Sequence, residues 1–285
     1  GRCTDPALVL GPLIKEFEWD EDDWQNLATG TMAGHLLECG GQVTGAYFAD
    51  PGYKDVPDLA NVGFPIAEVS NDGSLIITKA ENTGGIVSAQ TVKEQLLYEI
   101  HDPENYFTAD VILDISKVSV SEVGPDRVKV LGASGKPRPD TLKATVSIDG
   151  GWMGEAEMSY AGPNALKRAQ LAIDVLKSRC RDIKTNNPIR FDIVGTMSVH
   201  SGDNEDTTNT HKYPDDGDYR IRIATCGHDK EIVERVNQEM LSLYCSGPAA
   251  GGGFRQHLTD QVQTASILVD RNKIVPKVHF LTDYA

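Results

Sequence analysis

Hydrophobic residues recur at the spacing of an α-helix in five stretches of the chain. In the first stretch, Leu10, Leu13 and Ile14 would share one face, as residues three and four positions apart do on a helix. The second stretch begins with the acidic run 20–23, which suits the positive end of a helix dipole. The pattern predicts helices over residues 6–17, 20–39, 86–100, 164–181 and 229–244.

Glycines leave two details of these helices open. Gly30 and Gly34 lie inside the second helix, where they permit either close packing or a break. Residues 82–85 (Asn-Thr-Gly-Gly) can open the third helix directly. Thr91 and Glu94 have the spacing of a capping box and would start it later.

Short apolar runs between turn residues predict strands. The strongest signal is a hairpin of 66–69 and 75–78 around Asn71-Asp72-Gly73. Residues 41–64 and the polar insertion 201–218 are typical of loops. Further strands are expected at 111–115, 117–121, 127–132, 142–148, 189–199, 219–225, 262–269 and 274–281.

These elements together predict a mixed α/β (α+β) fold with a β-rich middle section. From residue 142 onward the order is strand, helix, strand, strand, helix, strand, with one strand more. That order is a βαββαβ, ferredoxin-like (split βαβ) plan. We therefore expect two domains, 1–140 and 141–285, the first carrying the candidate site and the second a glycine-rich loop.

Composition narrows the class of protein. The chain has 285 residues, 40% of them hydrophobic, and a net charge of −15. Such acidity disfavours nucleic acid and anionic membranes as partners. No run of about 18 apolar residues and no signal peptide is visible. Five scattered cysteines without a CxxC pair indicate a reduced, cytoplasmic compartment rather than a disulfide framework.

The segment 34–45 concentrates the candidate chemistry. His35, Glu38 and Cys39 stand at positions i, i+3 and i+4, on one face of a helix that ends at the glycine pair 40–41. An imidazole, a carboxylate and a thiol can act as acid/base, nucleophile or metal ligands. Each residue also has a structural interpretation, because cysteine and a hydrogen-bonded histidine are common in cores. For the three together we favour function.

A second cluster lies at 98–106. The third helix should end at His101-Asp102, because a residue that precedes proline disfavours the α conformation. Glu99 and Asp102 then share one loop with His101 and Tyr106. Ordinary capping accounts for part of this cluster.

Two glycine-rich segments are candidate ligand loops. Thr83-Gly84-Gly85, after Lys79, can bind an anion at a helix N-terminus, although a plain turn is favoured because the GxGxxG context is missing. Gly251, Gly252 and Gly253 are followed by Arg255, which can bind carboxylate or phosphate. A flexible loop without a ligand is the alternative.

A metal site is an alternative interpretation of these residues. His35, Glu38 and Cys39, or His35 with Asp102 or Asp114, offer ligands for a divalent ion. Their spacing matches no strong zinc signature, so no metal is assigned and the cofactor stays open.

Four stretches resemble the acyclic terpene utilisation (AtuA-type) family, long known as a domain of unknown function. They are TGTMAGHLLECGGQVTGAYF, GFPIAEVSNDGSLIITKAENTGGIVSAQTVKEQLLYEIHDPENYFTADV, YAGPNALKRAQLA and CSGPAAGGGFR. The resemblance covers most of the chain, in the same order. The opening GRCTDPALVLGPL, which lacks an initial Met, resembles an internal stretch of the family. It implies a further α/β half-domain upstream, on the same chain or on a companion subunit.

The resemblance implies a role in the breakdown of branched acyclic terpenoids or related acids as CoA thioesters, with no settled reaction. An enzyme acting on a branched acyl-CoA or carboxylic acid, by hydration or C–C lysis, needs a base and an oxyanion site. Glu38 or Glu99 would be the base, with His35 or His101 as its partner.

In this hypothesis the substrate is held by the glycine segments. Amides near Gly84-Gly85 would hold the oxyanion, with Lys79 and Thr83 beside them, and 251–253 with Arg255 would hold phosphate or carboxylate. The alternative is a non-catalytic subunit or assembly module of a larger complex, and an oligomer is expected in either case.

Overall fold

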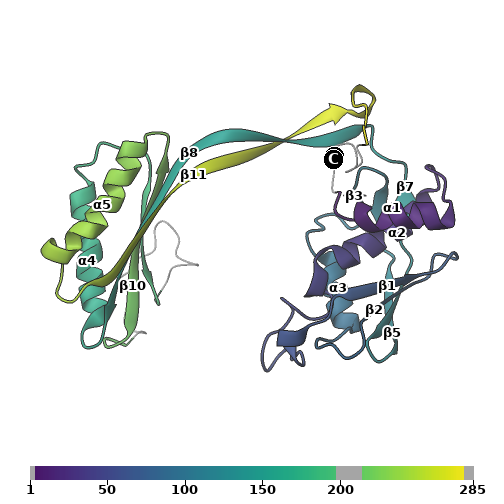
Figure 1. Cartoon of the computed structure of the whole chain (residues 1–285), viewed down its shortest axis with the longest axis horizontal. Helices are drawn as coiled ribbons and strands as arrows, with labels where there is room; N and C mark the ends of the chain where they lie inside the picture. The colour runs from purple at the N-terminus through teal and green to yellow at the C-terminus, as the bar shows by residue number, and fades with distance from the viewer. Residues whose placement is uncertain (1–3, 197–213, 279–285) are drawn as a thin grey trace, which may run out of the picture. The chain divides into compact units, whose positions relative to one another are not determined.

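The computed structural model describes residues 4–196 and 214–278, which form two compact units (Figure 1). Unit 1 comprises the described residues up to Ala144 and those from Ser266 on, and unit 2 is Thr145–Ala265. Each unit has its own hydrophobic core. The fold is mixed α/β with antiparallel sheets, as the sequence predicts.

Unit 1 is built around one buried helix. This helix, α2, contacts α1, α3 and strands of two sheets, and its residues from Leu27 to Leu36 are all buried. It begins later than predicted because Asp23 caps it by accepting the Asn26 backbone N–H at 3.2 Å. The helices of unit 1 are α1 Ala7–Phe17, α2 Trp24–Glu38 and α3 Ala89–Leu97, with 3₁₀ turns Gly40–Gln42, Leu59–Asn61 and Arg271–Lys273.

The glycines inside α2 serve close packing rather than a break. A Cβ at Gly34 would lie 2.4 Å from the Pro6 carbonyl oxygen, and one at Gly30 would lie 2.7 Å from Leu10 Cδ1. The absence of side chains therefore lets α1 approach α2 closely at this crossing.

Two small sheets flank these helices. The predicted hairpin is confirmed: β1 and β2 pair antiparallel with Val69 opposite Leu75, and Gly73 takes positive φ in the turn. The first sheet has the order β1-β2-β6-β5, and the second has the order β3-β4-β7. The strands are β1 Pro65–Val69, β2 Leu75–Lys79, β3 Tyr106–Phe107, β4 Ile112–Asp114, β5 Ser119–Gly124, β6 Arg127–Leu131 and β7 Ser134–Lys136.

Both predicted starts of the third helix are wrong. Ser88 is the N-cap, and it forms a capping box with Thr91. The helix therefore begins at Ala89, and Glu94 lies in its middle, where its side chain pairs with Lys54 instead.

Unit 2 confirms the ferredoxin-like plan. Its sheet has the strand order β11-β8-β10-β9, which is 4-1-3-2 in chain order, with β10 antiparallel to both of its neighbours. The two helices pack on β10, and their apolar residues meet Ile221 and Ile223 in one core. The elements are β8 Thr141–Ala161, α4 Ala165–Cys180, β9 Ile189–Val194, β10 Asp218–Gly227, α5 Lys230–Ser246 and β11 Gly252–Asp270.

The outer strands of unit 2 are longer than predicted, and one predicted strand is wrong. β8 continues well past 148, and β11 begins at Gly252 rather than at 262. Residues 274–278, the described part of the predicted last strand, form no strand. The predicted loop 201–218 lies outside the described residues up to 213, as does the end of the predicted strand 189–199.

Candidate functional site

The C-terminal end of α2 brings the imidazole and the carboxylate together. His35 is fully buried, and its Nδ1 lies 2.8 Å from Glu38 Oε1. Its Nε2 lies 3.3 Å from the Leu96 carbonyl oxygen, and the Tyr106 ring packs at 5.4 Å between ring centroids. Gln95 of α3 donates to the His35 carbonyl oxygen at 2.9 Å. The helical spacing read from the sequence thus places this pair in direct contact.

The geometry fixes where protons can sit in this pair. A backbone carbonyl only accepts, so Nε2 carries a hydrogen when it bonds Leu96. Nδ1 then faces Glu38 Oε1, and a hydrogen bond between them needs one further proton on one of the two atoms. In that arrangement one proton lies between Nδ1 and Oε1.

The second oxygen of Glu38 differs from the first in its contacts. The Glu38 side chain is only 10% exposed, and Oε2 is buried without a hydrogen bond from any described residue. Glu38 lines a cleft of about 420 Å³, which we call the Glu38 cleft. Its walls are Asp5, Leu8, Val9, Gly34, Leu37, Glu38, Cys39, Tyr98 and Glu99. A ligand with an N–H or O–H group would donate the missing hydrogen bond to Oε2.

Cys39 lies in the same cleft but is poorly suited as a nucleophile. Burial raises the pKa of its thiol, and the negative charges of Glu38, Glu99 and Asp5 raise it further, against a hydrogen bond from Gln95 that lowers it. The thiolate, which is the reactive form, is therefore scarce near neutral pH.

Glu99 and Asp102 have different surroundings. Glu99 lines the Glu38 cleft and takes positive φ at the end of α3, and its charge raises the pKa of the neighbouring Tyr98 hydroxyl. Asp102 is exposed and caps a turn, accepting the Glu104 N–H and the Asn105 side-chain amide, both at 3.0 Å. The contacts of Asp102 are therefore those of a capping residue, whereas Glu99 lines the same cleft as Glu38.

The Thr83–Gly85 segment uses its polar groups internally. The Gly84 N–H donates to Asn61 O and the Gly85 N–H to Pro57 O, so neither amide is available for an oxyanion. Glycine is needed at residue 84 because a Cβ there would lie 1.9 Å from a backbone oxygen, that of Asp58. Lys79 donates to Thr83 O at 2.8 Å and pairs with Asp126, and the Thr83 hydroxyl donates to Ala80 O. These contacts are those of a tight structural turn.

The 251–253 segment and Arg255 belong to unit 2. Gly252 and Gly253 open β11 rather than forming a free loop, and Gly253 takes positive φ. A Cβ at Gly251 would lie 2.7 Å from the sulfur of Met158, so this glycine permits close packing. Arg255 pairs with Glu157 at 3.3 Å. Of the predicted site residues, Glu38, Cys39 and Glu99 line the Glu38 cleft. His35 does not line it but contacts Glu38.

A metal site finds little support in the arrangement of side chains. Within residues 4–196 and 214–278, no group of three or more His, Cys, Asp or Glu residues is placed to hold an ion. Cys39, Cys180, Cys226 and Cys245 are free thiols.

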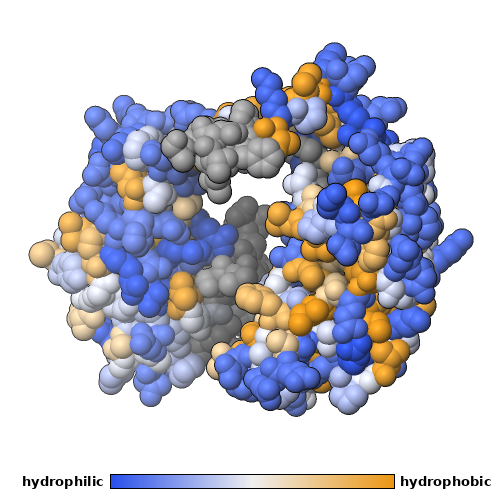
Figure 2. Space-filling view, turned by 45° about the vertical axis from the view of Figure 1, so that its right-hand side comes forward, coloured by the Kyte–Doolittle hydropathy of each residue, from blue (hydrophilic) through white to orange (hydrophobic). Residues whose placement is uncertain are grey.

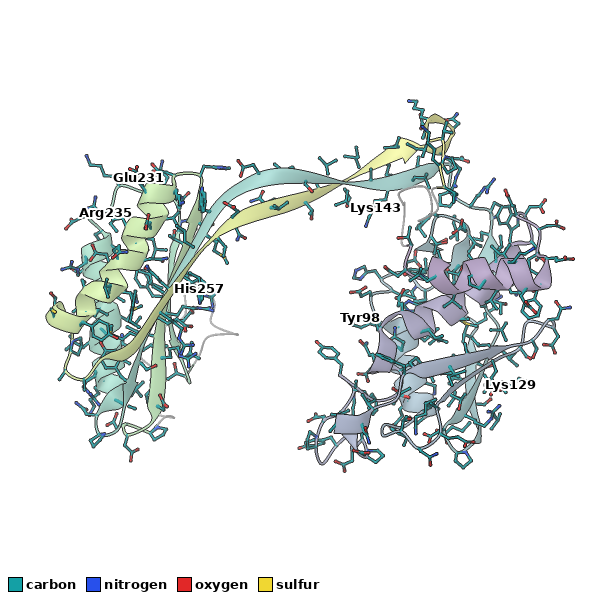
Figure 3. The ribbon with its side chains drawn as sticks, viewed as in Figure 1. Tyr98, Lys129, Lys143, Glu231, Arg235 and His257 are labelled. Atoms are coloured by element: carbon teal, nitrogen blue, oxygen red, sulfur yellow. The ribbon has the colours of Figure 1, made fainter. Side chains whose placement is uncertain are left out.

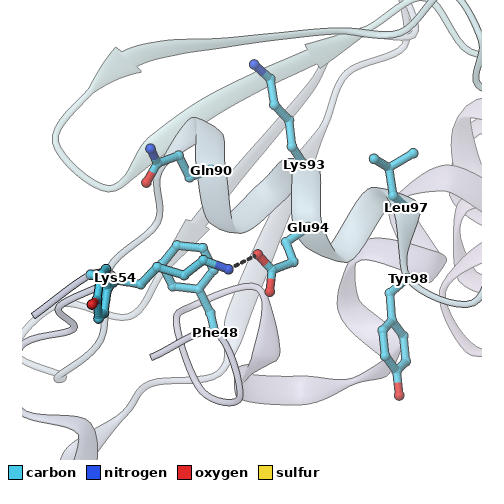
Figure 4. Close-up of a pocket in the computed structure, with 8 residues that line it drawn as sticks. Phe48, Lys54, Gln90, Lys93, Glu94, Leu97 and Tyr98 are labelled. Carbon is cyan, nitrogen blue, oxygen red and sulfur yellow. Dashed lines mark hydrogen bonds and ion pairs between the residues drawn. The ribbon is translucent and has the colours of Figure 1, made fainter. Parts of the chain in front are cut away.

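A second cleft adjoins this region and was not predicted. It has a volume of about 660 Å³, and we call it the lysine cleft. Its lining residues are Phe48, Tyr53, Lys54, Gln90, Lys93, Glu94, Leu97 and Tyr98 (Figure 4). Tyr98 lines both clefts (Figure 3). Three lining residues come from 41–64, a segment that the sequence predicts only to be a loop.

Residues 1–280 match the family model described as acyclic terpene utilisation family protein AtuA. The two-unit α/β chain described above therefore belongs to the acyclic terpene utilisation (AtuA) family. No curated protein and no solved structure matches the chain. No helix among the described residues is long and apolar enough to cross a membrane.

Proposed function

We propose that the chain is a catabolic enzyme that acts on a branched acyl-CoA or carboxylic acid by hydration or carbon–carbon lysis, in a reducing cytoplasm. The observation that carries this proposal is the buried Oε2 of Glu38, which no described residue bonds, on a side chain that lines a cleft. A buried acceptor without a donor costs free energy, which a substrate proton or hydroxyl would recover. Membership of a terpene-utilisation family supports the substrate class.

Both reactions use the same proton transfer at Glu38. In hydration, a water oxygen bonds to the β-carbon of an unsaturated acyl group while Oε2 takes one proton of the water. The electron pair of the double bond moves to the α-carbon, which then receives a proton. In lysis, Oε2 takes the proton of a β-hydroxyl, the O–H pair becomes part of a carbonyl, and the Cα–Cβ pair remains on the α-carbon until that carbon is protonated.

His35 is the positioning partner in this scheme. Its Nδ1 contact holds Oε1 of Glu38, which aims the carboxylate and leaves Oε2 to react. The proton shared by the pair can return to the α-carbon through Glu38, which regenerates the starting state.

The cleft lining favours a thioester over a free carboxylate at the reacting end. Leu8, Val9 and Leu37 offer an apolar wall for a branched chain. Asp5 and Glu99 stand beside Glu38, and their charges would repel a substrate carboxylate. Because the amides of Gly84 and Gly85 are engaged elsewhere, oxyanion stabilisation has to come from other donors.

The test is turnover of a panel of methyl-branched enoyl-CoA and 3-hydroxyacyl-CoA thioesters, followed by mass spectrometry. Glu38→Gln keeps the size of the side chain and removes the base, so we expect kcat to fall by about 100-fold or more. Glu81→Gln, an exposed residue with the same charge change, is the matched control. Unchanged turnover in Glu38→Gln would remove Glu38 from this role.

A second candidate function, a subunit or assembly module, is favoured by exposed apolar strand residues. Val146 and Ile148 on β8 and Val262 on β11 are 39%, 48% and 68% exposed. Figure 2 shows hydrophobic side chains among hydrophilic ones on the visible surface. Solvated strands with apolar side chains are places where another chain can add. Light scattering tests this role: Val262→Thr should shift an oligomer towards monomer, and a monomeric wild-type chain contradicts it.

A further inference from the structure

The lysine cleft lies in unit 1, over one exposed face of α3. The exposed face of α3, with Gln90, Glu94 and Leu97, forms its floor (Figure 4). The rings of Tyr53, which is exposed, and Tyr98, which is half-buried, line it, whereas Phe48 is buried beneath Lys54. Aromatic rings around an open floor suit a planar ring, which gains stacking and apolar burial there.

Two ammonium groups border the same surface. Lys54 Nζ lies 4.7 Å from the centroid of the Phe48 ring and 2.7 Å from Glu94 Oε2. Lys93 extends away from this pair in Figure 4, and no described residue forms an ion pair with it. Two lysines against one glutamate leave one net positive charge at the cleft. This local charge is opposite in sign to that of the chain as a whole, whose net charge is −15.

We propose that the lysine cleft binds an adenine nucleotide, with the base against the aromatic rings and the phosphates at Lys93 and Lys54. The lining combines aromatic rings with ammonium groups, and a simpler ligand would use only one of the two. An apolar chain gains nothing from ammonium groups at the rim, and a free phosphate gains nothing from the rings of Tyr53 and Tyr98. The Gln90 amide supplies a donor and an acceptor for the edge of a base.

The shared residue Tyr98 connects this proposal to the Glu38 cleft. A nucleotide in the lysine cleft would be one end of an acyl thioester, and the acyl group at the other end would reach Glu38. This link rests on the proposed function. The phosphates of the substrate would then bind in unit 1, rather than at 251–253 and Arg255 as the sequence suggests.

The experiment is calorimetric titration of the whole chain with adenosine 3′,5′-bisphosphate, a probe with the base and two phosphates but no acyl group. Lys93→Gln and Lys54→Gln should each weaken binding by about fivefold or more, and the double variant further, because each removes one charge–phosphate contact. Lys129→Gln is the control, since this lysine lies on β6 in the same unit and lines neither cleft (Figure 3). Binding should also weaken with added salt.

Three results would overturn the proposal: no measurable binding, equal affinity in Lys93→Gln, Lys54→Gln and wild type, or loss of binding in Arg255→Gln instead. Glu38→Gln separates the two proposals because it should abolish turnover and leave titration with the bisphosphate unchanged. A chain that depends on Glu38 for turnover but does not bind the bisphosphate would keep the proposed function and lose this inference.

Discussion

Two carboxylates with little solvent exposure, Asp192 in unit 2 and Glu38 in unit 1, have different hydrogen-bond partners. In unit 2, Asp192 is 2% exposed and accepts from two arginines, Arg190 at 3.0 and 3.1 Å and Arg222 at 3.0 and 2.7 Å. In unit 1, Glu38 has one oxygen bonded to His35, and the other bonds no residue that the structure describes. The contacts of Asp192 are those of a structural carboxylate, whereas Glu38 is the candidate for chemistry that we propose.

The largest expected effect concerns the two hydrophobic cores. Ile77 in unit 1 and Ile223 in unit 2 are both fully buried. Replacing either with Ala should cost about 2–5 kcal/mol, because it removes apolar contacts and leaves a cavity. Native-state hydrogen exchange should show faster opening of β2 in Ile77→Ala and of β10 in Ile223→Ala. Equal acceleration of both strands by either variant would show that the cores are not separate.

The next largest effect is the difference in stability lost when each of the two carboxylates is replaced by an amide. Asp192→Asn removes the buried charge that Arg190 and Arg222 share, although Arg222 keeps Glu155 at 3.7 Å, so unit 2 should lose about 3 kcal/mol in urea unfolding. Arg190 and Arg222 are partly exposed, which keeps the loss near the lower end for buried pairs. Glu38→Gln should cost less than about 1.5 kcal/mol, because an amide can still bond His35. A larger loss for Glu38→Gln would make Glu38 structural.

The smallest effect is a difference in thiol reactivity. Cys39 in unit 1 has a raised thiol pKa, so less of it is thiolate at a given pH. Its rate of alkylation by iodoacetamide should therefore lag behind that of the exposed Cys226 and Cys245 of unit 2 at pH 8, and should still be rising above pH 9. Peptide mass spectrometry reads the three rates separately. A Cys39 that reacts first at pH 7 would restore it as a nucleophile candidate.

The sequence predicts local structure well where one signal decides it. The hairpin around Asn71-Asp72-Gly73 needs only a turn and two apolar runs, and the βαββαβ order follows from alternating elements. The length of β8 was missed because a glycine pair, Gly150-Gly151, interrupts its pattern, although Gly151 continues the strand at positive φ. The start of α3 was missed because Ser88 and Thr91, rather than Thr91 and Glu94, form the capping box.

The candidate site was predictable only in part. Helical spacing is enough to place Glu38 beside His35, because both lie on α2. The contributions of Gln95 and Tyr98 depend on how α3 packs against α2, and that is a tertiary contact. The glycine segments were ambiguous for a physical reason: Gly84 and Gly251 lie in close packing contacts, and sequence alone does not distinguish that requirement from ligand approach.

The central claim is that ligand binding takes place in unit 1, at the two clefts that share Tyr98. Hydrogen–deuterium exchange with and without a methyl-branched acyl-CoA tests it most directly. Peptides covering 34–56 and 88–99 should gain protection on binding, and peptides covering 247–259 should not change. Protection confined to 247–259, with no change around Glu38 and Tyr98, would contradict the claim.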